Sequence, residues 1–148
     1  MPPTPKYTLE TLLRVPAVVE GMRNAWLDSN PGPVGGHEEG GFVCEKAGGE
    51  LVVLRWPHGE RSLIVVPDHR NCRFAGMAIL VTFHTHPNTG PSDCPEPSDT
   101  DRQAIEQDAN LKDRYYLGEF VISNETIYAI SQDGSVAELA STCDILFP

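Results

Sequence analysis

The first part of the chain carries apolar residues at the spacing of a helix. Between residues 8 and 28 they recur along one helical face, with a break at Pro16. Proline suits the first position of a helix, where its missing N–H has no partner to lose. We therefore predict one short helical turn followed by a longer amphipathic helix. The stretch 30–36, rich in proline and glycine, predicts a loop.

Short runs of β-forming residues follow this loop. Three of them, separated by turns that contain glycine or proline, predict an antiparallel meander over residues 41–46, 51–56 and 62–66. Residues 77–83 form a nearly continuous apolar run, which is typical of a strand buried on both faces. The chain then reaches His84 and His86, so both histidines are expected at a strand end.

The last third of the chain predicts a second helix and more strands. Residues 89–97 are rich in proline, serine, aspartate and glycine and predict a loop, after which a helix is expected from Ser98 to about Asn110. Three further strands are expected at residues 118–123, 126–131 and 136–140. The expected fold class is a single mixed α/β domain over residues 1–148. Its mostly antiparallel sheet is flanked by the long N-terminal helix and the second helix.

Composition narrows the classes of function. The net charge of −10 argues against a nucleic-acid partner, which needs clustered lysine and arginine, and favours a basic partner or substrate tail. No apolar run approaches the roughly 20 residues that span a bilayer, so no membrane role is expected. The N-terminus lacks the pattern of a signal peptide, and the expected location is the cytoplasm.

The cysteines give no sign of a metal or redox motif. Cys44, Cys72, Cys94 and Cys143 are scattered and form no C-x-x-C pair, which excludes a zinc ribbon. They are expected to be free thiols, with a Cys72–Cys94 bridge as the alternative for a secreted chain.

The two histidines are the first candidates for chemistry. His84 and His86 lie two positions apart in an extended chain, so their imidazoles point to the same side and can share one metal ion. A catalytic zinc takes three protein ligands and leaves one position open, so a third ligand is needed. An isolated H-x-H is more often a pair of polar residues on a wet strand end.

Residues 97–101 offer the third ligand. Ser98 followed by Asp101 is the signature of a helix N-cap. Such a cap places Asp101 in the first helical turn, where its carboxylate can face the histidines, and leaves the Ser98 hydroxyl beside it to polarise a carbonyl. Asp99 and Asp93 are weaker alternatives as ligands.

An acidic pair precedes the first predicted strand. Glu38 and Glu39 are followed by Gly40 and Gly41, and the glycines oppose the H-E-x-x-H zinc helix, whose second histidine position is occupied by Gly41. Taken alone, the two glutamates are ordinary solvated acids. The glycines allow the backbone to pass close to another part of the chain.

In their order along the chain, these three motifs resemble the JAMM (JAB/MPN-type) metallopeptidase family, in its compact prokaryotic-like form. They are glutamate before paired glycines, H-x-H-P, and P-S-x-x-D. The resemblance implies an MPN/JAB-like, cytidine-deaminase-like architecture. It also implies that zinc is bound by His84, His86 and Asp101, that Glu38 takes the proton of the zinc-bound water, and that Ser98 stabilises the oxyanion.

The activity implied by the resemblance is zinc-dependent hydrolysis of a peptide or isopeptide bond, with a protein substrate such as a ubiquitin-like conjugate. Alternatives are a peptidase of cell-wall, phage-tail or toxin context, a non-catalytic MPN scaffold, and a binding domain with an incidental H-x-H. Eleven residues separate His86 from Ser98, about four more than is usual in the family, a loop extension of small entropic cost. This loop is expected to border the zinc and to influence substrate choice. Substrate identity and oligomeric state stay open.

Overall fold

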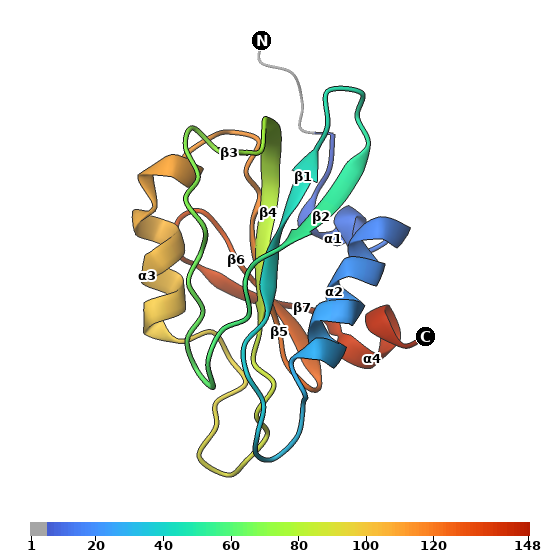
Figure 1. Cartoon of the computed structure of the whole chain (residues 1–148), viewed down its shortest axis with the longest axis vertical. Helices are drawn as coiled ribbons and strands as arrows, with labels where there is room; N and C mark the ends of the chain where they lie inside the picture. The colour runs from blue at the N-terminus through green and yellow to red at the C-terminus, as the bar shows by residue number, and fades with distance from the viewer. Residues whose placement is uncertain (1–5) are drawn as a thin grey trace.

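A computed structural model describes residues 6–148 and shows three layers. A seven-stranded sheet lies in the middle, with helices α1, α2 and α4 on one face and α3 on the other (Figure 1). The helices are α1 Leu9–Leu12, α2 Pro16–Asp28, α3 Asp99–Gln107 and α4 Thr142–Leu146, with a 3₁₀ turn η1 at Ala109–Leu111. The expected mixed α/β class, with a long N-terminal helix and a second helix beyond the histidines, is therefore confirmed.

The sheet is mostly antiparallel, as expected, with one parallel pair. Its strands are β1 Gly40–Glu45, β2 Leu51–Arg55, β3 Arg73–Phe74, β4 Met77–Thr85, β5 Gly118–Ile122, β6 Thr126–Ile130 and β7 Val136–Ser141. Their order is β2-β1-β4-β5-β6-β7, with β3 paired to the start of β4. Only β4 and β5 run parallel, because the chain between them crosses the sheet through α3. This crossover brings the first turn of α3 toward the end of β4.

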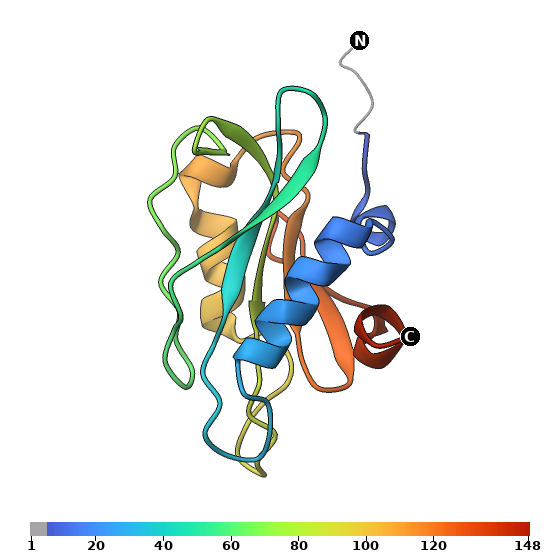
Figure 2. The same cartoon turned by 45° about the vertical axis from the view of Figure 1, so that its right-hand side comes forward.

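The N-terminal helices form as the sequence predicts. Thr8 caps α1, and Pro16 takes the first position of α2. The buried face of α2 includes Val18, Met22 and Trp26, which pack against the sheet in one hydrophobic cluster. Figure 2 shows α2 lying diagonally across the strands with α4 beside it. Helix α4 was not expected from the sequence.

Alternating side chains divide the core between the two faces of the sheet. On β1, Val43 belongs to the cluster under α2, whereas Phe42 and Cys44 belong to the cluster under α3. Strand β4 is central and contributes to both clusters, for example through Phe83 and Ile79. This confirms the expectation of a strand buried on both faces, and it gives the histidines a rigid support.

One predicted strand is wrong. Residues 62–66 belong to no strand but to an irregular crossing segment, residues 57–72, that runs along the α3 side of the sheet (Figure 1). Backbone bonds hold it there: the Glu38 amide donates to the Glu60 carbonyl, and the Gly59 amide donates to the Glu38 carbonyl. Farther along, His69 pairs with Asp108 at the end of α3. The residues of this β-type pattern, 62–66, therefore lie on the α3 side of the sheet, where most of them line a cleft, instead of extending the sheet.

The second helix is shorter than expected. Helix α3 ends at Gln107, and the residues that follow form the turn η1 instead of continuing to Asn110. Asp108 causes this break, because it takes an extended conformation and its side chain accepts a hydrogen bond from the Asn110 amide. Within residues 6–148, none of the helices has the length and the apolar character required to cross a bilayer.

The paired glycines are explained by close packing, which gives a testable prediction. A Cβ on Gly40 would lie 2.5 Å from the Trp56 ring and 2.6 Å from the Phe83 carbonyl. Gly40→Ala is expected to destabilise the protein by about 1–3 kcal/mol in urea unfolding, the usual cost of overpacking. Gly48→Ala is the matched control, since a Cβ there meets nothing within 4 Å. Equal stability of the two variants would contradict this close packing.

Candidate metal centre

The two histidines meet at the end of β4. His84 is the next-to-last residue of β4, and His86 lies just beyond the strand. Because their side chains leave the same side of the extended chain, their Nε2 atoms come within 3.2 Å of each other. His84 is buried and His86 is half-buried. The expected convergence of the two imidazoles is present.

Asp101 completes the cluster from the first turn of α3. Ser98 is the N-cap: its hydroxyl oxygen accepts from the Asp101 amide at 3.1 Å, and its own amide donates to Asp101 Oδ2 at 2.9 Å. The capping box fixes the carboxylate so that Oδ1 lies 3.4 Å from His84 Nε2 and Oδ2 lies 3.2 Å from His86 Nε2. The helix cap and the candidate ligand are therefore compatible, as the sequence predicted.

The side chains of His84, His86 and Asp101 lie close enough together to share one ion, with one ligand atom from each within 4.8 Å of the others. Zinc bonds of about 2.0–2.1 Å in tetrahedral geometry place ligand atoms about 3.3 Å apart. The two Nε2 atoms lie 3.2 Å apart. Each of them approaches a different oxygen of the Asp101 carboxylate, at 3.4 Å for His84 and 3.2 Å for His86. The competing ligands fit less well, because the Asp99 side chain is 88% exposed and Asp93 is paired with Arg61. The donor set of His84, His86 and Asp101 fits zinc.

The charges of the cluster are mutually stabilised. Burial by itself lowers the pKa of His84, but the neighbouring Glu119 and Asp101 carboxylates outweigh it and hold this pKa well above its ordinary value. Burial by itself raises the pKa of Asp101, but hydrogen bonds from His84, His86 and the Ser98 amide outweigh it and lower this pKa. A bound dication would displace the imidazole proton, because a ligating histidine is neutral.

Glu38 lies in the same cleft as these residues and is buried, not solvated. Its side chain lines the cleft beside His84, Ser98 and Asp101. Burial raises the pKa of Glu38 above the ordinary glutamate value, and the charges of His84 and His86 oppose this rise. A carboxyl group with a raised pKa is suited to general acid–base work near neutral pH.

Ser98 retains a hydroxyl proton for a substrate. Its oxygen accepts the Asp101 amide, but among residues 6–148 its hydroxyl donates to no protein acceptor. The side chain lines the cleft next to Asp101. It can therefore donate to a carbonyl oxygen placed there.

Two partners of the histidines have no signal in the sequence. His86 Nδ1 lies 3.1 Å from the Pro95 carbonyl oxygen, in the long loop 89–97. His84 Nδ1 lies 3.4 Å from Glu119 Oε1, on β5. The loop does border the site, as expected, and it contacts one of the candidate ligands. Asp93 of this loop is already paired with Arg61 of the crossing segment.

Glu39 is a structural residue, contrary to its expected solvated state. Its side chain is 7% exposed and pairs with Arg55 at 2.5 Å and with His37 at 2.6 Å. Its main chain bonds Thr85, which follows His84: the Glu39 amide donates to the Thr85 hydroxyl, and the Thr85 amide donates to the Glu39 carbonyl. Glu39 therefore anchors Glu38 against the end of β4.

The burial of Glu39 gives a second prediction. Glu39→Gln is expected to destabilise the protein by about 3 kcal/mol in urea unfolding, because it leaves the partly buried Arg55 without its main counter-charge. Glu50→Gln is the control, since the pair between Lys46 and Glu50 is exposed and worth less than about 1 kcal/mol. A Glu39 variant as stable as the Glu50 variant would show that the buried pair contributes nothing.

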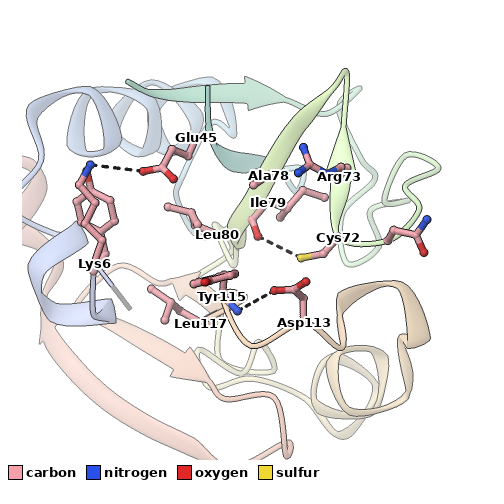
Figure 3. Close-up of a pocket in the computed structure, with 12 residues that line it drawn as sticks. Lys6, Glu45, Cys72, Arg73, Ala78, Ile79, Leu80, Asp113, Tyr115 and Leu117 are labelled. Atoms are coloured by element: carbon pink, nitrogen blue, oxygen red, sulfur yellow. Dashed lines mark hydrogen bonds and ion pairs between the residues drawn. The ribbon is translucent and has the colours of Figure 1, made fainter. Parts of the chain in front are cut away.

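The candidate ligands His84 and Asp101 line a cleft between the crossing segment and α3. The cleft has a volume of about 410 Å³, and apolar side chains of Trp56, Leu63 and Ile105 form part of its wall. A separate cavity of about 370 Å³ lies near the start of β4, at the other end of this strand (Figure 3). Lys6 and Glu45 pair on one side of it, and no histidine lines it. The candidate site residues Glu38, His84, Ser98 and Asp101 line the first cleft.

The cysteines form no disulfide, which excludes the alternative Cys72–Cys94 bridge: Cys72 is buried and Cys94 is exposed. Burial raises the pKa of the Cys44 thiol to about 11 and that of the Cys72 thiol to about 12. A hydrogen bond with Glu96 raises the pKa of Cys94. None of these three thiols is activated as a nucleophile.

No protein-family model, curated protein or solved structure matches the chain. The chemistry of the site is therefore inferred from its own residues.

Proposed function

We propose that the protein is a zinc metallopeptidase of the JAMM type that hydrolyses a peptide or isopeptide bond. The observation that carries the proposal is the convergence of His84, His86 and Asp101, each of which offers a ligand atom within 4.8 Å of the other two. Two histidines and one carboxylate are a familiar catalytic zinc set, with one position left for water. A buried glutamate in the same cleft adds the base that hydrolysis requires.

Each residue has one task in this proposal. His84, His86 and Asp101 would hold the ion, which when bound would act as a Lewis acid and lower the pKa of its water toward about 7. Glu38 accepts the proton of the attacking water and delivers it to the departing amine. Ser98 donates a hydrogen bond from its free hydroxyl to the carbonyl oxygen of the substrate as negative charge develops there.

The proposed substrate is a protein whose flexible tail can enter the cleft, such as a ubiquitin-like protein joined through its C-terminus. The resemblance to JAMM peptidases favours this class, and the net charge of −10 favours a basic tail. Peptides of cell walls or phage tails are the alternative substrates, since the fold alone does not set the substrate. A non-catalytic scaffold is disfavoured because the chain retains ligands, base and serine together.

Elemental analysis followed by cleavage assays tests the proposal. The purified protein is expected to carry about one zinc per chain. It should cleave a ubiquitin-like protein that bears a C-terminal extension or an isopeptide-linked lysine. A chelator should stop cleavage and added zinc should restore it, whereas Cys94→Ser should retain activity. A folded protein that takes up no zinc would refute the metal centre, and cleavage of a cell-wall stem peptide alone would select the alternative substrate class.

A further inference from the structure

We propose that Glu119 is a positioning residue for the metal centre. Its carboxylate accepts a hydrogen bond from the Nδ1–H group of His84 and thereby keeps Nε2 of this histidine directed at the metal. The inference assumes the proposed zinc site and adds a residue that none of the three sequence motifs contains. Glu119 lies on β5, about twenty residues beyond the last of them.

The parallel pairing of β4 and β5 brings the two side chains together. Thr82 is the register partner of Glu119, and His84 is the register partner of Val121. Side chains of Thr82, His84 and Glu119 therefore leave the sheet on the α3 face. Glu119 Oε1 lies 3.4 Å from His84 Nδ1, and both side chains are 5% exposed.

The burial of Glu119 requires a partner, because an ionised carboxylate removed from water is costly unless it is paired. The nearby hydroxyls of Thr82 and Tyr116 bond each other at 2.7 Å. Among residues 6–148, His84 is the residue that forms an ion pair with the Glu119 carboxylate. The strand pair thus holds a buried carboxyl group that contacts a candidate ligand.

The contact determines which nitrogen of His84 faces the metal. A neutral imidazole carries one proton, so a proton on Nδ1 leaves the Nε2 lone pair free for the ion. A carboxylate at Nδ1 also makes the imidazole a stronger ligand. His86 receives the same orientation from a backbone carbonyl, that of Pro95, in a loop. His84 receives it from a side chain on a rigid strand.

Zinc affinity measured by competition with a chromogenic chelator tests this role. Glu119→Leu is expected to bind zinc about 10–100-fold more weakly than the wild type, and Glu119→Gln to fall between them because its amide oxygen still accepts. Tyr116→Phe is the matched control, since it removes a buried hydrogen bond on the same face without touching His84. It should bind zinc within about twofold of the wild type.

Nitrogen NMR of the zinc-loaded wild-type protein, with ¹⁵N-labelled histidine, is an independent measurement. It does not depend on whether the Glu119 variants fold. The ring of His84 should carry its proton on Nδ1 and bind zinc through Nε2. Coordination through Nδ1 would overturn the proposal, as would a folded Glu119→Leu protein with wild-type zinc affinity. Failure of the wild type to bind zinc would instead refute the proposed function, so the two failures are distinguishable.

Discussion

Replacing His84 and His86 together with alanine is expected to lower zinc content from about one ion per chain to almost none and to abolish hydrolysis. The reason is that Asp101 alone cannot hold a catalytic ion, whereas the three residues together offer ligand atoms that all lie within 4.8 Å of one another. Asp101→Ala should also lose most of the metal, because its carboxylate reaches both histidines. Elemental analysis and cleavage assays on the same preparations measure both effects.

Asp99→Ala is the control for these ligand variants. Asp99 is also in the first turn of α3, but its side chain is 88% exposed and pairs with Arg102 at the surface. The zinc content of the Asp99→Ala variant should match that of the wild type. Full zinc occupancy in the double histidine variant, or loss of zinc in the Asp99 variant, would show that the ligand set has been assigned to the wrong residues.

Glu38→Gln is expected to keep the zinc and the fold while lowering kcat by roughly 10²–10⁴, the usual size of a general acid–base contribution. Glutamine has the same shape but cannot accept the proton of the attacking water. The fold should not suffer, because burial already opposes the charged form of Glu38 and raises its pKa. Urea unfolding should therefore show stability equal to or above that of the wild type.

Glu60→Gln is the matched control for the general base. Glu60 is exposed and its backbone carbonyl accepts the Glu38 amide, so it shares the local backbone without lining the cleft. Its kcat should be unchanged. If the Glu38→Gln variant is active, Glu38 is not the general base. If the Glu60→Gln variant is inactive, the general base lies in the crossing segment instead.

Local patterns in the sequence determine the positions of the candidate metal ligands. Side chains of residues two positions apart in a strand point to the same side. His84 and His86 therefore converge through their spacing alone. The N-cap signature at Ser98 fixes Asp101 in the first helical turn, and both halves of the capping box are present. These features depend on neighbours along the chain, and for that reason the sequence predicts them.

Tertiary packing decides what the local pattern leaves open. Residues 62–66 have the composition of a strand, yet they run along the α3 side of the sheet because His69 and Glu60 bind the crossing segment to residues outside the sheet. The burial of Glu39 likewise follows from Arg55, on β2. The Glu119 contact with His84 arises from the register of two parallel strands joined by a helix. Such pairings link residues distant along the chain, and no local spacing encodes them.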